Sequence, residues 1–220
     1  MKTLQKFGGF AALYLAVVYL IGMVIFLVVL DYPSITDPAQ KVALLVDKQM
    51  VIFSTNLLMY VFFGIILIVL LLALYDRLKS GAPAIMQVAT AIGIIWAGSL
   101  IASGMVLNAG IAPVIALYAK DPAQAALTWQ GIESIASGLG NGNGEILGGV
   151  WTLLVSLAAL RAGGLTKALN ILGLLVGAVG IISLIPGLTE GMIGVFGLSQ
   201  IIWFVWLGII LLRKNPSRAA

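Results

Sequence analysis

The stretch that decides the fold reads SGLGNGNGEILGGVW and runs from Ser137 to Trp151. It holds six glycines, two asparagines and Glu145, and it leads into an apolar run. Glycine lets backbones approach closely but weakens helices. A carboxylate beside an apolar segment is costly unless it finds a partner. Unfavourable free energy is therefore concentrated here, and a functional site is expected at the same place.

The composition indicates a membrane protein. Of the 220 residues, 61% are hydrophobic and only 9% are charged. A soluble domain has about 25% charged residues, so this chain has too few to cover a water-facing surface. The length fits a single polytopic membrane domain over 1–220, with the lipid bilayer as its main partner.

Several function classes are excluded by the residues that the chain lacks. It has no cysteine and no histidine, which removes disulfides, thiolate metal sites, histidine-ligated haem and histidine bases. We expect no metal, no cofactor and no enzymatic activity. The net charge of +4 is spread between apolar runs, so no nucleic-acid partner is expected.

Six apolar runs are long enough, or nearly so, to cross a bilayer core, which needs about 20 residues. The expected fold is an all-α membrane protein with six transmembrane helices, the first of them retained in the mature chain. The predicted spans are 8–30, 49–75, 84–107, 145–161, 167–186 and 193–212. A short apolar segment, 109–120, contains Pro113 and is expected to be interfacial or a bent continuation of the third span.

The charges predict the orientation of these spans, because basic residues favour the cytoplasmic side. One side carries nine basic residues and one acid, and the other carries three basic residues and seven acids. Both termini are therefore expected to be cytoplasmic, with segments 31–48 and 108–144 outside. The basic residues on the cytoplasmic side are Lys2, Lys6, Arg77, Lys79, Arg161, Lys167, Arg213, Lys214 and Arg218.

The two outer segments share the tetrapeptide DPAQ, at 37–40 and 121–124. Asp as N-cap, Pro at the first helical position and Gln three residues after the cap are the chemistry of a helix start. The match is either convergent cap chemistry or a duplicated two-span hairpin, which would be a parallel repeat. In both cases helices two and four are expected to begin outside the membrane and extend into it.

The segment 121–161 allows two structures. Small residues at Ala136, Gly140, Gly144, Gly148, Thr152 and Ser156 would form a stripe at a spacing of four on one long helix. The alternative is a break at 141–144 that leaves Glu145 at the start of a half-helix, where the helix dipole stabilises a carboxylate. Backbone exposed at such a break could line a wet cavity.

Polar residues of the outer half define a candidate ligand site. Glu145 either lies in the headgroup zone or lies deeper, where a raised pKa would suit a proton or cation role. Trp129 is read either as part of an outward-facing pocket or as an interfacial aromatic, and Asn56 and Asn108 either as ligands or as interhelical hydrogen-bond partners. The residues of this candidate pocket are Glu145, Glu133, Asn141, Asn143, Trp129, Asn108 and Asn56.

From Gly144 onward the chain resembles an uncharacterised bacterial family of six-span integral membrane proteins, domain of unknown function 4386. The resemblance lies in the glycine-rich lead into Trp151, the Leu-rich span, the turn at 161–167 and the LGLLVG opening of the next span, 172–177. This turn reads RAGGLTK and lacks a Pro-Arg pair expected there. The resemblance implies a topology and the bacterial cytoplasmic (inner) membrane, and it implies no activity.

The expected function is a non-enzymatic integral membrane helical bundle. It would bind a lipid or small amphiphile, or serve as an accessory subunit to a membrane-protein partner through its glycine faces. The alternative is a small proton- or cation-coupled transporter that uses Glu145 at a broken fourth helix. An intramembrane enzyme would need a carboxylate-only or serine mechanism, and no G-x-S-x-G elbow is present.

Overall fold

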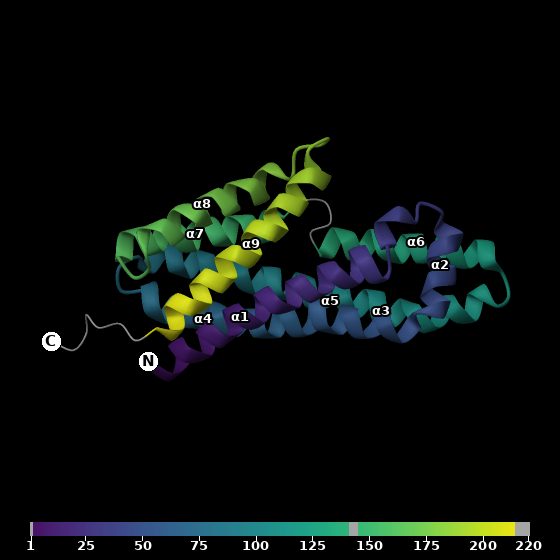
Figure 1. The fold of residues 1–220 in the computed structure, drawn as a ribbon, viewed down its shortest axis with the longest axis horizontal. Coiled ribbons are helices and arrows are strands. Elements are labelled where there is room, and N and C mark those ends of the chain that lie inside the picture. Colours follow the sequence, from purple (N-terminus) through teal and green to yellow (C-terminus); the bar gives the residue numbers. More distant parts are fainter. Residues whose placement is uncertain (1, 141–144, 214–220) are drawn as a thin grey trace. The chain divides into compact units, whose positions relative to one another are not determined.

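The computed structural model describes residues 2–140 and 145–213, and the regular structure of these residues is entirely helical (Figure 1). The all-α fold class is thus confirmed. The elements in chain order are α1 (Lys2–Val24), η1 (Ile25–Val29), η2 (Tyr32–Ser34), α2 (Pro38–Asp47), α3 (Gln49–Asn56), η3 (Leu57–Phe62), α4 (Phe63–Leu78), α5 (Pro83–Tyr118), α6 (Pro122–Leu139), α7 (Ile146–Ala162), α8 (Lys167–Ile182) and α9 (Thr189–Leu212). The elements η1 and η3 are π-helical, and η2 is a 3₁₀ turn.

Four helical stretches are long and apolar enough to cross a membrane: Thr3–Val29, Gln49–Leu78, Pro83–Tyr118 and Gly191–Leu212. Helices α7 and α8 are apolar but shorter, at 17 and 16 residues. The predicted fifth run, 167–186, extends beyond its helix. The helix ends at Ile182, and the chain then turns before α9. In this turn Gly187 takes a φ of 88°, which favours glycine.

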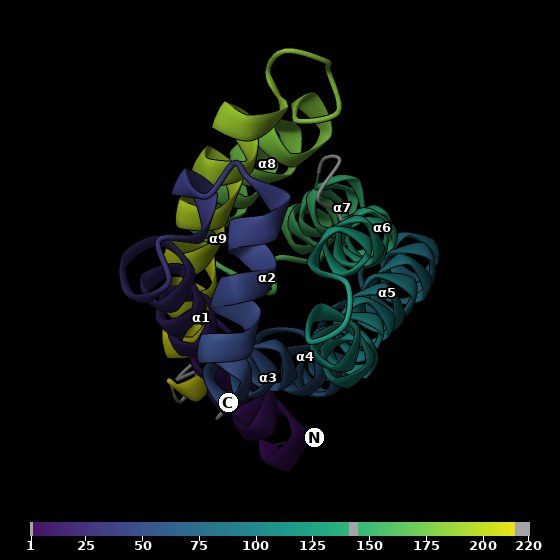
Figure 2. The same ribbon diagram turned by 90° about the vertical axis from the view of Figure 1, so that its right-hand side faces the viewer.

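Helix α5 is continuous over 36 residues and includes Pro113 in its interior. Of the two expectations for 109–120, the continuation of the third span is therefore confirmed. Helix α6 packs back against α5, since the hydroxyl of Ser103 donates to the carbonyl of Ala136 at 2.8 Å. A Cβ at Gly110 would lie 2.7 Å from Cδ1 of Ile132, so the two helices form a close hairpin, which Figure 2 shows nearly end on.

Both DPAQ segments begin helices, as predicted. The Asp37 carboxylate accepts from the amide of Ala39 at 2.9 Å, and Asp121 accepts from the amide of Gln124 at 3.0 Å. The predicted extension of helices two and four is wrong in one respect. Lys48, with φ −111° and ψ 26°, separates α2 from α3, and α6 ends at Leu139, before α7 begins. Residues 38–47 and 122–139 are therefore helices of their own.

The contacts of the chain divide it into two units. Unit 1 comprises 1–17, 65–97 and 143–220, and unit 2 comprises 18–64 and 98–142. Helices α1, α4 and α5 contribute residues to both units. Each unit is described by itself below.

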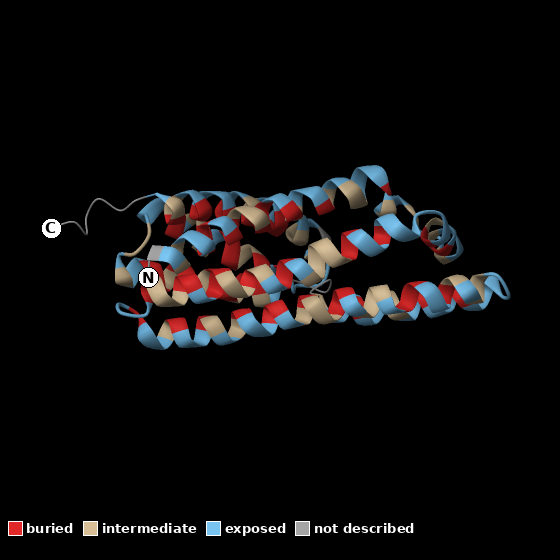
Figure 3. Ribbon diagram, turned by 90° about the horizontal axis from the view of Figure 1, so that it is seen from below, coloured by how far each residue is buried: buried red, intermediate tan, exposed pale blue. Residues whose placement is uncertain are grey.

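The core of unit 1 is aromatic and tightly packed. Trp151 of α7 lies between Trp96 of α5 and Trp203 of α9, with ring centroids 5.6 Å away on each side. All three side chains are buried. Buried positions alternate with exposed ones along the helices (Figure 3), because each helix packs one face against its neighbours.

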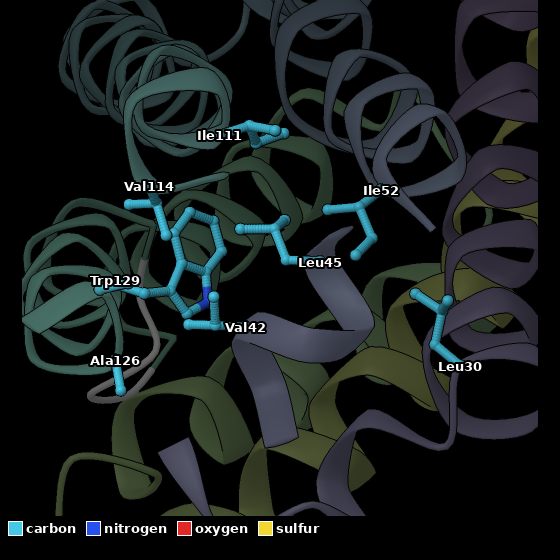
Figure 4. Close-up of a cluster of buried hydrophobic side chains, with 9 residues drawn as sticks. Leu30, Val42, Leu45, Ile52, Ile111, Val114, Ala126 and Trp129 are labelled. Carbon is cyan, nitrogen blue, oxygen red and sulfur yellow. The ribbon is translucent and has the colours of Figure 1, made fainter. Parts of the chain in front are cut away.

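The core of unit 2 lies between α2 and α6 and the ends of α3 and α5 that face them (Figure 4). Trp129 is its largest member and is 3% exposed. The cluster consists of Leu30, Val42, Leu45, Ile52, Ile111, Val114, Ala125, Ala126 and Trp129. Because α2 is amphipathic, it places Val42 and Leu45 in this core while Ala39 and Val46 remain exposed.

Candidate functional site

In unit 2, Glu133 of α6 forms a network with residues of two other elements. The hydroxyl of Tyr32, in η2, donates to Oε1 of Glu133. The ammonium of Lys41, in α2, lies 3.5 Å from Oε2. Both charged side chains are about a quarter exposed, at 27% for Lys41 and 23% for Glu133. Glu133 was predicted to bind a ligand, but both of its carboxylate oxygens have partners within the chain.

Tyr32 connects this network to the hydrophobic core. Nε1 of Trp129 donates to the Tyr32 hydroxyl at 3.1 Å, and the Lys41 ammonium lies 4.9 Å from the centroid of the Tyr32 ring. Burial, and then the hydrogen bond and charge of Glu133, raise the pKa of Tyr32. The phenol therefore keeps its proton and acts as the donor to the carboxylate.

The ring of Trp129 is buried between α2 and α6, so Trp129 is a core residue of unit 2 rather than an exposed side chain. Sequence reasoning also missed Tyr32 and Lys41. A signal for Lys41 was present: it precedes Val42, and the amphipathic pattern of 38–47 places it at the edge of the buried face. Tyr32 lies in a short turn, and no periodic pattern marked it.

Asn56 and Asn108 form an interhelical pair in unit 2. Nδ2 of Asn56 donates to Oδ1 of Asn108 at 3.0 Å, and Nδ2 of Asn108 donates to the carbonyl of Phe53 at 3.2 Å. The reading of both residues as interhelical hydrogen-bond partners is thus confirmed. Asn56 is 1% exposed, and its Oδ1 has no partner in the described part of the chain. The pair joins the last residue of α3 to α5.

Glu145, in unit 1, is the N-cap residue of α7. The described residues of 121–161 form two helices, α6 ending at Leu139 and α7 beginning at Ile146, and the predicted break at 141–144 lies outside the described residues. The amide of Glu145 donates to the hydroxyl of Ser183 at 2.8 Å, which holds the start of α7 beside the end of α8. The carboxylate makes no cap hydrogen bond, and no bond or ion pair joins it to another described residue.

The predicted pocket is therefore only partly assembled from the described residues. The structure brings Glu133 and Trp129 together through Tyr32, and it pairs Asn56 with Asn108. Glu145 belongs to unit 1, whereas these four residues belong to unit 2. Asn141 and Asn143 lie outside the described residues.

The glycines of α7 and α8 form a close helix–helix contact within unit 1. A Cβ at Gly149 would lie 2.9 Å from the carbonyl oxygen of Gly177 and 3.0 Å from Cα of Gly180. Gly177 and Gly180 thus give α8 a close-packing face toward α7. The predicted single long stripe is wrong: Gly148 faces Trp96 and Phe196, and the contact with α8 uses Gly149, which the stripe did not include.

A row of buried polar groups follows α7 from Glu145 toward the C-terminal end of the helix. The hydroxyl of Thr152 donates to Oε1 of Gln200, on α9, at 3.2 Å. One turn further, Ser156 Oγ and Trp203 Nε1 both lie near the point that a Cβ of Gly173 would occupy, at 2.0 Å and 2.6 Å. Ser156 Oγ, Trp203 Nε1 and Gln200 Nε2 are buried without a partner among the described residues.

We compared the chain with models of known families, with curated proteins and with solved structures, and no match was found in any of the three. The site is therefore interpreted from its own geometry.

Proposed function

We propose that this chain is a six-span integral membrane protein of the bacterial cytoplasmic membrane with both termini cytoplasmic, and a member of the family of domain of unknown function 4386. Four helices have the length and composition of membrane spans. Helices α7 and α8 would complete the six as a hairpin, at about 25 Å each with flanking residues reaching the headgroups. The close contact between the glycines of α7 and α8 supports two membrane spans there, because glycines let helices pack closely in lipid.

For the function, we propose a non-enzymatic helical bundle that binds a lipid or small amphiphile, with Glu145 as the ligand's polar contact. The observation that supports this proposal is the position of Glu145. Its backbone is fixed by Ser183 at the start of an apolar helix, while its carboxylate has no partner among the described residues. An amphiphile with a hydrogen-bonding or cationic head could pair with that carboxylate while its apolar part lies along the helices.

A role as an accessory subunit would need glycine faces that are open to a helix of a partner protein. Gly149, Gly177 and Gly180 are instead used between α7 and α8 of the same chain. Binding of a small molecule is therefore the form that we favour.

Native mass spectrometry of the gently extracted protein tests the proposal. We expect a discrete bound mass in the wild type that is lost in Glu145→Gln. The matched control is Asp47→Asn, which also removes one carboxylate but lies in unit 2, where Asp47 pairs with Lys48 on the surface at 3.0 Å. A bound mass retained in Glu145→Gln, or absent from a folded wild type, would contradict the role of Glu145.

A proton- or cation-coupled carrier is the second candidate, and the polar row of α7 favours it. Glu145, Thr152 and Ser156 follow one another on α7 at spacings of seven and four residues, which keeps them on one side of a helix. The carrier predicts solute flux into reconstituted vesicles that depends on a pH or cation gradient and is lost in Glu145→Gln. A binder without transport activity would show the bound mass and no gradient-dependent flux.

A further inference from the structure

One end of unit 1 gathers helix ends from distant parts of the chain. Nε2 of Gln5 donates to the carbonyl of Leu211 at 3.0 Å, which places the start of α1 beside the end of α9. Nε of Arg77 donates to the carbonyl of Gly164 at 2.9 Å, which places the end of α4 beside the turn between α7 and α8. The four residues belong to the same unit.

The turn between α4 and α5 lies at this end as well. A Cβ at Gly81 would lie 2.5 Å from Cα of Ala162, the last residue of α7. A Cβ at Gly164 would lie 2.5 Å from Cδ2 of Leu78, the last residue of α4. In Figure 1 the ends of α1, α4, α7, α8 and α9 that these contacts join are all drawn toward the left.

This end is strongly basic. Its described charged residues include a single acid, Asp76, whose carboxylate is already paired with the ammonium of Lys79 at 2.8 Å. Arg161 and Lys167 flank the turn between α7 and α8, and both are exposed. The described basic residues of this end are Lys6, Arg77, Lys79, Arg161, Lys167 and Arg213.

Exposed apolar side chains adjoin these charges. Phe7, which follows Lys6 on α1, is 55% exposed, and Phe10, one helical turn after Lys6, is 62% exposed. Leu160 precedes Arg161 on α7 and is also exposed. A ligand that suits both features carries a negative charge and an apolar chain, whereas a free phosphate ion would use the charges alone.

We propose that this basic end of unit 1 binds the headgroups of anionic phospholipids, with Arg161 and Lys167 at the turn between α7 and α8 as principal contacts. Basic residues beside a membrane surface attract anionic lipid headgroups with an effect that adds up over the residues and weakens with ionic strength. The acyl chains would lie along the exposed apolar faces beside Phe7 and Leu160. This inference rests on the proposed membrane insertion, but it is independent of a ligand at Glu145.

The test is a lipid titration of the purified full chain in micelles, followed by native mass spectrometry. Phosphatidylglycerol and phosphatidylcholine with identical acyl chains are added in parallel arms, and inorganic phosphate is added in a third. We expect the wild type to bind phosphatidylglycerol preferentially. In Arg161→Gln/Lys167→Gln, phosphatidylglycerol binding should weaken roughly fivefold for each charge removed.

The control variant Lys48→Gln/Lys120→Gln removes the same charge from two exposed lysines of unit 2. It should keep the preference for phosphatidylglycerol, and its retention would exclude a pure effect of net charge. Three results would each overturn the proposal. They are equal binding of the two lipids by the wild type, an equal loss of phosphatidylglycerol binding in the control variant, or binding of inorganic phosphate as tight as that of phosphatidylglycerol. Recovery of the wild type in the soluble fraction of cells would instead contradict membrane insertion itself.

Discussion

The hydroxyl of Tyr32 donates a hydrogen bond to the carboxylate of Glu133, 101 residues further along the chain. The same hydroxyl accepts a hydrogen bond from the indole of Trp129. One phenol, in η2, is therefore bonded to residues on two successive turns of α6. These two hydrogen bonds hold α6 beside η2, a segment about a hundred residues earlier in the chain.

Tyr32→Phe should destabilise unit 2. The substitution keeps the ring but leaves the Trp129 indole and one oxygen of Glu133 without a partner, at a cost of about 1–3 kcal/mol. Hydrogen exchange of the backbone amides of α6 in mixed micelles would measure this loss without changing the other tryptophans. Lys120→Gln, an exposed substitution in the same unit, is the control. A stability equal to that of the wild type would show that the hydrogen bonds of Tyr32 are formed equally well by water.

Alkaline pH should weaken the same unit. The pKa of Tyr32 in the folded chain is raised above the ordinary 10.0, first by burial and then by Glu133. The unfolded chain therefore releases the phenolic proton at a lower pH than the folded chain does. The contribution of Tyr32 is fully present below about pH 10 and declines as the pH rises above that value. Unfolding measured between pH 8 and 11 should show a steeper decline for the wild type than for Tyr32→Phe, and parallel profiles would contradict this.

Gly177→Ala should separate α7 from α8. The new methyl group would lie 2.6 Å from Cβ of Leu153 and 2.7 Å from the carbonyl oxygen of Gly149. Because one of these atoms belongs to the backbone, the helices must move apart, and we expect a loss of about 1–3 kcal/mol. Gly194→Ala in α9 is the matched control, since a Cβ there meets nothing within 4 Å. The free energy of unfolding in mixed micelles compares the two, and equal values would show that the hairpin has more room than the contact distances indicate.

The pair of Thr152 and Gln200 should behave non-additively. Thr152→Val alone leaves the buried amide of Gln200 with no partner among the described residues, at roughly 1 kcal/mol for an interhelical polar contact in membranes. Adding Gln200→Leu removes both polar groups and should recover most of that loss. Unfolding free energies of the two single variants and the double variant test this cycle. Additive losses would mean that the row of polar groups is already satisfied, for example by water.

Much of the helical architecture could be predicted from the sequence, because it depends on long apolar runs and on local cap chemistry. The two DPAQ segments illustrate this, since Asp37 and Asp121 cap helices where the local pattern placed them. A helix start at Glu145 was one of two alternatives, because the glycines of 137–149 suit both a close-packing helix stripe and a helix end. Only tertiary contacts, such as the bond from Glu145 to Ser183, distinguish a helix start from a position inside a helix.

The partners of the polar residues could not be predicted, because they depend on contacts between segments far apart in the sequence. Glu133 was recognised as a candidate, but its partners Tyr32 and Lys41 lie about a hundred residues earlier. Gly149 was overlooked for a related reason. A stripe at a spacing of four identified Gly148, and the orientation of α7 against α8 is set by packing rather than by the periodicity of one helix.

The length of α5 has a consequence for proteolysis. Its 36 residues span about 54 Å, whereas the hydrocarbon core of a bilayer is about 30 Å thick. In a membrane-inserted chain, tilting alone would not hide the whole helix, so the end near Tyr118 would stand in water. Lys120, in the turn that follows, would then be accessible to trypsin on one face of a sealed vesicle and protected on the other. A single cleavage product could in this way reveal which face of the membrane each end of the chain occupies.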